Sequence, residues 1–379
     1  MRVLLTGGGT SGHVTPALAI IDIIRAREPD SQFAYIGTEK GIEKRLAEKE
    51  GIPFYPIKIQ GVSRSISPKN IKTAYLVMTA PAKAKKIIQK FKPDVVIGTG
   101  GYVSWAPLKA AAELGIPTII HESNSVPGLA VRRLESKVDT ILTNFEGTRN
   151  CLKERDKTIC VGNPIRTSFA GIDKAEARKK LGIDDSVRFV VLSFGGSLGA
   201  PKLNEAAIDI MREFSSKHDD VEHFHSGGRN YYKNAMQIFA GYSLEKNKHL
   251  DIKEYIYDMS LYMAAADLCV CRAGAMTLTE LAMLGKPAIL IPSPNVTDNH
   301  QYKNAKALAD KGAAILIQES ELSSDLIAST VERLYSTPSE LERMSRAVKS
   351  FANPSVGDEI YKEISKLVRC KEKIKRKEG

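Results

Sequence analysis

The sequence lacks an apolar run of the roughly 18 residues that a membrane-spanning helix needs. It passes from Met1 and Arg2 directly into a strand-like segment, so we expect no secretion signal and a cytosolic protein. The composition, 43% hydrophobic and 26% charged residues, is ordinary for a folded globular chain. A chain of 379 residues is too long for one core, and about 150 residues per domain predicts two or three domains.

Cysteine is scarce, and none of the five cysteines stands at a spacing typical of a metal site. Two of them, Cys269 and Cys271, alternate along the apolar run DLCVC, which predicts that both pack on one face of a buried strand. We therefore expect reduced, structural thiols, and we expect neither a metal nor a cofactor. The other three are Cys151, Cys160 and Cys370.

Acidic residues are few at the two ends of the chain, and the net charge is +11. Residues 1–164 carry 24 Lys and Arg against 15 Asp and Glu, and the tail 365–379 carries 7 against 2. Nucleic acid and an anionic membrane surface are the usual partners of such regions. No nucleic-acid motif accompanies the charge, so we expect no nucleic acid and keep the membrane surface as a candidate partner.

Short apolar runs alternate with amphipathic stretches through the first half of the chain. Continuous runs rich in Val, Ile and Leu, spaced by helices, are typical of parallel strands covered on both faces. They predict a doubly wound α/β domain at residues 1–164. The runs that predict strands are 2–6, 32–37, 54–59, 94–99, 117–122 and 140–144, and the amphipathic stretches include 16–28, 41–50 and 106–114.

The same pattern restarts in the second half. The run RFVVLSFGGSLGA (188–200) predicts a strand that ends in a glycine-rich turn and opens a helix. We expect a second Rossmann-like domain at 165–349, after a hinge near 162–165, with the basic helical tail 350–379 returning to the first domain. The further runs that predict strands are 221–227, 250–256, 267–272, 287–292 and 313–317.

The stretch GGGTSGHVTPALAI (7–20) has the spacing of a dinucleotide fingerprint. That reading needs an acidic residue after the second strand, where Glu39 is a poor candidate, and it gives His13 no task. At the start of a helix the positive dipole end favours a neutral imidazole, which can accept a proton from a hydroxyl group. His13 is therefore a candidate general base, although a cap or a hydrogen bond within the loop would also explain a histidine here.

Further polar clusters follow other predicted strands. Because ligands bind at the carboxyl ends of strands in open α/β sheets, we expect a cleft between two facing domains. Backbone N–H groups at the glycine turns can bind a nucleotide diphosphate without a metal, and the Glu280 carboxylate can accept hydrogen bonds from ribose hydroxyls. Gln301 and Asn304 can reach sugar hydroxyls. The clusters are GTGGYVSWAP (98–107), HESNSVPGLA (121–130), GGSLGA (195–200), CRAGAMTLTELAMLGKP (271–287) and DNHQYKNA (298–305).

These stretches, together with GNPIR (162–166), occur in an order and spacing that resembles the MurG family, N-acetylglucosaminyltransferases of the two-domain GT-B class. The resemblance runs from residue 3 to about residue 310. It implies transfer of N-acetylglucosamine from UDP-GlcNAc to the muramoyl C4 hydroxyl of lipid I, giving lipid II with inverted anomeric configuration. The implied setting is peptidoglycan synthesis at the cytoplasmic face of the membrane, with cell-wall assembly proteins as further partners.

The resemblance also implies roles for particular residues. His13 would be the general base or would stabilise the departing diphosphate, with Arg272 or Arg166 assisting, and Glu122 is the other candidate catalytic group. Ser11 departs from the family, which commonly has glycine there. The acceptor side would comprise Gly100, Gly101, Tyr102 and His121. UDP-GlcNAc contacts are implied at Thr10, Ser11, Gly12, Asn124, Arg166, Ser197, Ile256, Ala275, Met276, Thr277, Leu278, Thr279, Glu280 and Gln301.

The stretch 71–92 mixes apolar residues with Lys83, Lys85, Lys86 and Lys90. It is either a core-facing helix with a solvated lysine face or a shallow membrane contact, and a lipid-linked acceptor favours the second reading. Two other functions stay open. One is a different GT-B enzyme, a diacylglycerol glycosyltransferase or a UDP-GlcNAc 2-epimerase. The other is a nucleotide-sugar binder without catalysis.

Overall fold

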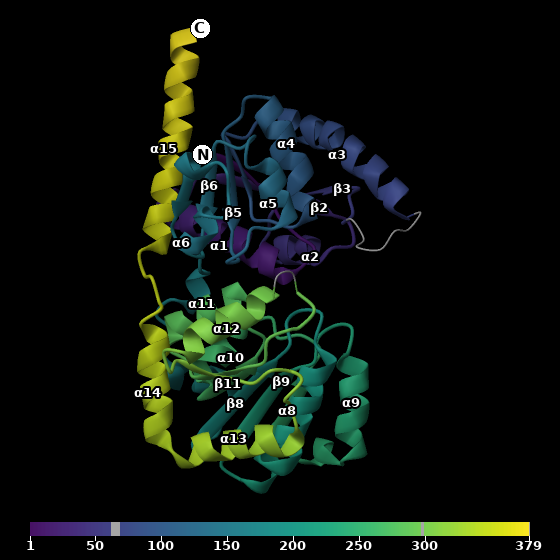
Figure 1. Ribbon diagram of the computed structural model, residues 1–379, viewed down its shortest axis with the longest axis vertical. Coiled ribbons are helices and arrows are strands. Elements are labelled where there is room, and N and C mark those ends of the chain that lie inside the picture. Colours follow the sequence, from purple (N-terminus) through teal and green to yellow (C-terminus); the bar gives the residue numbers. More distant parts are fainter. Residues whose placement is uncertain (62–68, 297–298, 379) are drawn as a thin grey trace. The chain divides into compact units, whose positions relative to one another are not determined.

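The computed structural model describes residues 1–61, 69–296 and 299–378, and it describes side chains in all of these except 69–72 and 372–378. The chain forms two compact units, Met1–Thr167 with Pro354–Gly379, and Ser168–Asn353. Each unit contains one parallel sheet with helices on its faces, so the predicted doubly wound α/β architecture is confirmed (Figure 1). The chain passes from one unit to the other at residues 167–168, three residues after the predicted boundary, and it returns at 353–354.

Unit 1 has a seven-stranded sheet in the order β3-β2-β1-β4-β5-β6-β7, and every pair is parallel. The strand order reverses direction between β1 and β4, and ligands of open α/β sheets usually bind at the carboxyl ends of the strands at such a point. The strands are β1 (Arg2–Thr6), β2 (Gln32–Thr38), β3 (Phe54–Ile57), β4 (Val95–Gly98), β5 (Thr118–Glu122), β6 (Thr140–Thr143) and β7 (Thr158–Cys160).

Helices bury both faces of this sheet because its strands are apolar on both sides. Val3 and Leu5 pack with α1, α2 and α15, whereas Leu4 packs with α3, α4 and α5. Val356 and Ile360 of α15 belong to the first of these cores, so the C-terminal segment completes unit 1 (Figure 1). The helices are α1 (Ser11–Arg27), α2 (Ile42–Lys49), α3 (Lys69–Phe91), α4 (Trp105–Glu113), α5 (Leu129–Leu134), α6 (Glu146–Arg149) and α15 (Val356–Glu378).

Unit 2 has a six-stranded parallel sheet in the order β10-β9-β8-β11-β12-β13, with its reversal between β8 and β11. Cys269 and Cys271 are fully buried in β11, as predicted from their alternation. The strands are β8 (Phe189–Phe194), β9 (Val221–Ser226), β10 (Leu250–Lys253), β11 (Leu268–Cys271), β12 (Ala288–Leu290) and β13 (Ala314–Leu316). The helices are α7 (Lys174–Leu181), α8 (Pro201–Glu213), α9 (Tyr232–Gly241), α10 (Met259–Ala265), α11 (Ala275–Leu284), α12 (His300–Ala309), α13 (Ser324–Ser336) and α14 (Pro338–Lys349).

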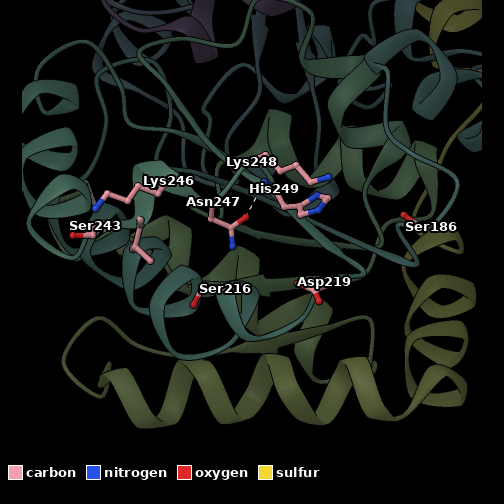
Figure 2. Close-up of a pocket in the computed structure, with 9 residues that line it drawn as sticks. Ser186, Ser216, Asp219, Ser243, Lys246, Asn247, Lys248 and His249 are labelled. Carbon is pink, nitrogen blue, oxygen red and sulfur yellow. Dashed lines mark hydrogen bonds between the residues drawn. The ribbon is translucent and has the colours of Figure 1, made fainter.

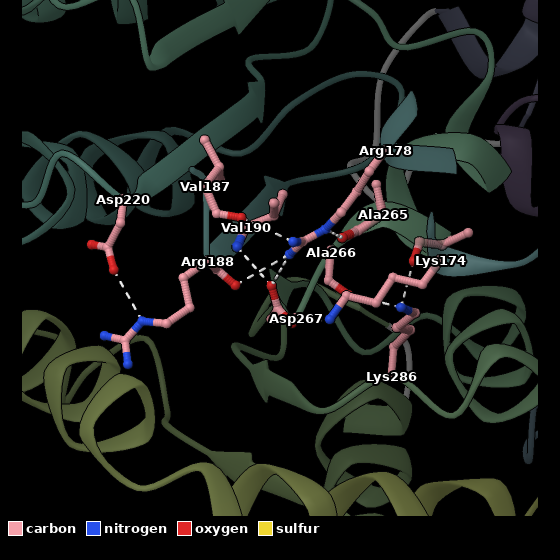
Figure 3. Close-up of polar contacts among 11 residues, drawn as sticks. Lys174, Arg178, Val187, Arg188, Val190, Asp220, Ala265, Ala266, Asp267 and Lys286 are labelled. Atoms are coloured by element: carbon pink, nitrogen blue, oxygen red, sulfur yellow. Dashed lines mark hydrogen bonds and ion pairs between the residues drawn. The ribbon is translucent and has the colours of Figure 1, made fainter. Parts of the chain in front are cut away.

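A polar cluster holds α7 against the amino-terminal edge of the unit 2 sheet (Figure 3). Asp267 accepts hydrogen bonds from Arg178 Nη2 at 2.6 Å and from the Val190 N–H group at 2.7 Å, and it pairs with Lys174. Lys286 donates to two carbonyls at the end of α10, and burial lowers its pKa to about 8. These charges are satisfied within the unit, so we assign the cluster a structural role.

No helix in the described ranges is long and apolar enough to cross a membrane.

Candidate functional site

Two glycine turns lie at the sheet reversal of unit 1. The first, residues 7–12, runs from the end of β1 into the first turn of α1, and the second, residues 99–102, follows β4. Gly100 and Gly101 have φ angles of +98° and +73°, which favour glycine. A Cβ atom on Gly101 would lie 2.1 Å from the Gly8 carbonyl oxygen, so the two turns are in direct contact. The sequence motifs 7–12 and 98–102 therefore form one structural feature.

His13 lies in the first turn of α1 and packs over the second of these turns. Its Nδ1 is 3.2 Å from the carbonyl oxygen of Thr99, and the Thr99 hydroxyl donates to the His13 carbonyl at 2.5 Å. A carbonyl only accepts, so Nδ1 carries a proton at this contact, and in a neutral ring the lone pair is then on Nε2. A Cβ atom on Gly100 would lie 2.7 Å from Nδ1, so that glycine makes room for the ring. These contacts fix the orientation of the ring.

Tyr102 stands beside the first glycine turn with its ring 36% exposed. A Cβ atom on Gly9 would be 3.1 Å from this ring. Partial burial and the nearby Glu43 carboxylate raise the pKa of the Tyr102 hydroxyl. Tyr102 is therefore a neutral hydrogen-bonding group at ordinary pH.

Glu43 is a residue of this region that the sequence analysis did not identify. Its side chain is fully buried in the first turn of α2, and Oε1 accepts from both the N–H and the hydroxyl of Thr38. A Cβ atom on Gly8 or Gly41 would lie within 3 Å of this carboxylate, so the glycine turn packs onto it. The local sequence offers no signal for this contact, because Gly8 and Glu43 are far apart in the chain.

Glu122 ends β5 and organises the loop that follows it. Oε1 accepts from the N–H and the Nδ2 group of Asn124 at 2.8 and 2.9 Å, and Oε2 accepts from the Gly128 N–H at 2.7 Å. Its side chain is 3% exposed. Three donors already occupy the carboxylate, so the observed contacts position Asn124 and the loop 122–128 rather than present a base to solvent.

His121, the preceding residue, is fully buried. Its Nε2 lies 2.9 Å from the Gly162 carbonyl oxygen, and burial lowers the pKa of the imidazole to about 4. The ring is therefore neutral, and its hydrogen bond joins β5 to the 162–165 segment. The sequence analysis had placed His121 among the acceptor-side residues.

Arg166 is held by acidic groups of its own unit. Its Nε and Nη2 atoms lie 2.6 Å and 2.9 Å from carboxylates of Asp22 and Glu50, on α1 and directly after α2. Burial by itself would lower the guanidinium pKa, but the two carboxylates outweigh it and the net shift is upward. Arg166 is thus a fixed cation, and the structure pairs it with these carboxylates.

In unit 2, the turn Gly195–Ala200 follows β8 at the sheet reversal and leads into α8. Gly196 and Gly199 have φ angles of +91° and +84°. The Ser197 and Leu198 carbonyls accept hydrogen bonds from the backbone N–H groups of residues 229 and 230, at 3.2 and 3.1 Å. The turn after β9 is therefore joined to the glycine turn 195–200 by two backbone hydrogen bonds.

Helix α11 begins on the other side of the same reversal, with Gly274 as its N-cap. The Thr279 hydroxyl donates to the Ala275 carbonyl within the helix. Burial raises the pKa of the Glu280 carboxyl to about 8. The predicted donor residues of this helix thus share one N-terminal segment, Ala275, Met276, Thr277, Leu278, Thr279 and Glu280.

The remaining predicted donor residues come from separate loops of unit 2. Ile256 is buried after β10, and the Gln301 side chain accepts from the Ser293 N–H at 2.9 Å. Arg272 donates to carbonyls at the end of β12 and pairs with Glu319 at 2.5 Å. The Asn304 amide donates to the Ala273 carbonyl at 3.3 Å. Asp298 lies outside the described residues.

A pocket of about 650 Å³ lies elsewhere in unit 2 (Figure 2). Its lining comes from segments that precede β8, β9 and β10, at the amino-terminal ends of these strands. The glycine turn 195–200 follows the carboxyl end of β8, so this pocket is separate from the candidate site. Its residues are Ser186, Ser216, Asp219, Ser243, Leu244, Lys246, Asn247, Lys248 and His249.

Comparison with known proteins agrees with this arrangement. Residues 3–143 match the glycosyltransferase family 28 N-terminal domain, and residues 190–360 match the family's C-terminal domain. An Acetivibrio thermocellus protein named UDP-N-acetylglucosamine–N-acetylmuramyl-(pentapeptide) pyrophosphoryl-undecaprenol N-acetylglucosamine transferase is 38% identical over 98% of this chain and 99% of its own length. A Listeria monocytogenes protein of the same name is 40% identical over 97% of this chain and 100% of its own length.

Among solved structures, Acinetobacter baumannii MurG aligns with a TM-score of 0.67 and 28% identity, covering 96% of this chain and 99% of that one. A Neisseria meningitidis UDP-GlcNAc 2-epimerase bound to UDP-GlcNAc also aligns with a TM-score of 0.67, over 97% of this chain and 100% of that one. At 15% identity the second likeness shows the fold alone. The GT-B fold is confirmed, and the chain belongs to glycosyltransferase family 28 and, within it, to the MurG N-acetylglucosaminyltransferases.

Proposed function

We propose that the protein transfers N-acetylglucosamine from UDP-GlcNAc to the C4 hydroxyl of lipid I, forming lipid II for peptidoglycan synthesis. This assignment rests on the names of relatives that match this chain over nearly their full length. The observation that supports the chemistry is His13, whose Nδ1 faces the Thr99 carbonyl and whose Nε2 keeps the lone pair that a general base needs.

In the proposed reaction, the C4 oxygen attacks the anomeric carbon from the face opposite the diphosphate. The hydroxyl proton passes to His13 Nε2 as the new C–O bond forms, and the bond from the anomeric carbon to the UDP oxygen breaks. The leaving diphosphate takes the electron pair of that bond. Backbone N–H groups of the turn 195–200 and of the start of α11 would stabilise its charge, because helix N-termini favour anions.

The other site residues take binding or positioning roles in this proposal. Glu122 would orient Asn124 toward the donor, since its carboxylate already accepts three hydrogen bonds. Tyr102, Gly100 and Gly101 would face the acceptor, and the buried His121 would support them indirectly. The further donor contacts proposed in this unit are Thr10, Ser11, Gly12 and Arg166.

Unit 2 would bind the donor. Glu280 would accept hydrogen bonds from the ribose hydroxyls. The other donor contacts proposed here are Ser197, Ile256, Ala275, Met276, Thr277, Leu278, Thr279 and Gln301.

The direct test is mass-resolved turnover of UDP-GlcNAc with a short-chain lipid I analogue, in the presence of EDTA and beside a control without acceptor. A product heavier by one N-acetylhexosamine, formed only with acceptor, is the expected result. Consumption of UDP-GlcNAc without acceptor would support an epimerase or a hydrolase. Glycosylation of diacylglycerol would indicate a different GT-B enzyme. Binding without turnover would indicate a nucleotide-sugar binder.

Donor binding should depend on pH through Glu280. Burial raises the pKa of its carboxyl to about 8, so most of the free protein carries it protonated at pH 7. The ionised form is the stronger acceptor of ribose hydrogen bonds, so affinity for UDP-GlcNAc should rise by up to about eightfold between pH 7.0 and 8.5. Calorimetric titration measures this change. E280Q should bind more weakly and with a flat pH profile, and an unchanged profile in E280Q would contradict the role.

We also propose peripheral association with the anionic cytoplasmic face of the membrane through α3. Ala80, Ala84 and Ile88 bury one side of this helix, while Tyr75 and Met78 are 66% and 80% exposed. The lysines at 83, 85, 86 and 90 are exposed as well. The side chains of residues 71 and 72 lie outside the described part of the chain. Exposed apolar and basic groups on one helix suit an interfacial contact.

Charge reversal tests this surface. The variant K83E/K85E/K86E should lose most sedimentation with vesicles rich in anionic lipid, because about 1 kcal/mol of attraction is expected for each lysine near such a surface. Exposed Lys233, Lys246 and Lys248 of unit 2, reversed together, provide a control of equal charge change. Equal sedimentation of both variants and the wild type would contradict the proposal.

A further inference from the structure

A line of five buried polar side chains runs between α8 and the sheet of unit 2. Ser193 lies on β8, His223 and His225 lie on β9, Asn204 is in the first turn of α8, and Ser215 follows α8. All have 0–3% of their surface exposed. Residues 193 and 225 are paired neighbours across the two strands, so their side chains share one face of the sheet. The proposed mechanism does not use any of them.

The five side chains are linked end to end. Ser215 Oγ lies 3.1 Å from His223 Nδ1, and His223 Nε2 lies 2.9 Å from Ser193 Oγ. Ser193 Oγ lies 2.8 Å from His225 Nδ1, and His225 Nε2 lies 3.1 Å from Asn204 Oδ1. The line therefore has four consecutive contacts, each within hydrogen-bond distance.

Asn204, at one end of the line, fixes the direction of two hydrogen bonds. Asn204 Nδ2 donates to the Gly227 carbonyl at 2.9 Å, because the opposite amide orientation would place two acceptors together. Asn204 Oδ1 then accepts, so His225 Nε2 carries the proton. The other nitrogen of His225, Nδ1, faces Ser193, 2.8 Å from the hydroxyl oxygen and 3.1 Å from the backbone carbonyl oxygen, and burial lowers the pKa of the ring to about 4.

The rest of the line lies beyond Ser193. His223 sits between the hydroxyl oxygens of Ser193 and Ser215, and burial keeps the pKa of its imidazole well below the ordinary value. His225 is the histidine of the line that contacts Asn204.

The Gly227 carbonyl, at the Asn204 end of the line, packs against the glycine turn 195–200 of unit 2. A Cβ atom on Gly199 would lie 2.3 Å from the Gly227 carbonyl oxygen, and one on Gly228 would lie 2.1 Å from the Gly199 backbone. The next two residues, Arg229 and Asn230, donate backbone hydrogen bonds to residues 197 and 198 of the turn. Any shift of the Gly227 carbonyl must therefore move the turn 195–200.

We propose that His225 is a positioning residue for donor binding: through Asn204 it fixes the Gly227 carbonyl, and through this carbonyl it fixes the glycine turn that binds the diphosphate. The inference rests on the proposed function, in which the turn 195–200 receives UDP-GlcNAc. His223 and Ser215 lie at the other end of the line, where their hydrogen bonds join Ser193 and each other rather than Asn204.

A pair of matched variants separates positioning from general stability. H225F and H223F each replace a fully buried histidine of the same line by an apolar ring, and both should lower the melting temperature. H225F should raise the Kd for UDP and the KM for UDP-GlcNAc about tenfold, because Asn204 loses the donor that orients it. H223F should leave both within about twofold of wild type. The acceptor KM should be unchanged in both.

Two milder variants keep the test decisive if H225F folds poorly. The H225Q side chain still offers an N–H donor to Asn204 and should bind UDP within about threefold of wild type, whereas the shorter H225N cannot reach Asn204 and should resemble H225F. Equal UDP binding by H225F, H225N and wild type would overturn the inference but leave the proposed function intact. An equal rise in Kd for H225F and H223F would also overturn it. Failure of the wild type to bind UDP would overturn the proposed function.

Discussion

Replacing His13 with alanine is expected to lower kcat by about 10²- to 10⁴-fold, the usual contribution of a positioned general base. Binding of UDP should stay within about twofold, because the contacts proposed for its diphosphate and ribose belong to unit 2 and His13 belongs to unit 1. The physical reason is the fixed ring orientation, in which Nδ1 donates a hydrogen bond to the Thr99 carbonyl at 3.2 Å and Nε2 is the nitrogen left to accept the hydroxyl proton. Steady-state kinetics with a lipid I analogue and calorimetry with UDP measure the two quantities.

The H13Q variant separates proton transfer from hydrogen bonding. Its amide N–H group can still donate to the Thr99 carbonyl, but it has no nitrogen that accepts a proton near neutral pH. We therefore expect H13Q to be as slow as H13A. H218Q removes a surface histidine of unit 2 and should turn over normally. Near-normal turnover by H13Q would mean that His13 only organises the glycine turns, and another group would have to take the proton.

The architecture was predictable from the sequence because most strands are buried on both faces. The run 32–37 was predicted and the structure has β2 at Gln32–Thr38, and the run 221–227 corresponds to β9 at Val221–Ser226. The strand β7 was missed: it has three residues, lies at the sheet edge and follows a charged segment. An edge strand this short leaves no apolar run to recognise.

The site was predictable only in part, because strand order brings distant segments together. Spacing alone placed His13 at a helix start, but the carbonyl that orients its ring belongs to Thr99, 86 residues later. Glu43 has no neighbours in the sequence that signal a buried carboxylate packed on the first glycine turn. Contacts of this kind depend on which strands are adjacent, and adjacency follows from the topology rather than from local pattern.

Replacing Gly101 with alanine should reduce kcat/KM for the lipid I analogue by about 10²-fold. Gly101 has a φ angle of +73°, and a Cβ atom there would lie 2.1 Å from the Gly8 carbonyl oxygen and 3.1 Å from His13 Cδ2. The backbone of Gly8 cannot yield as a flexible side chain would, so the methyl group must displace the first glycine turn and the ring. A misplacement of about 1 Å at a catalytic group can cost two orders of magnitude.

Gly115 supplies the matched control for this substitution. It belongs to the same unit and has a similar φ of +68°, but a Cβ atom there meets no atom within 4 Å. G115A therefore carries the left-handed backbone strain alone, about 1–2 kcal/mol, and should lower the melting temperature slightly while its kcat/KM remains near wild type. If G101A and G115A lose activity equally, strain in unit 1 would explain the loss. If only G101A loses it, the contact between the two glycine turns is what places His13 for catalysis.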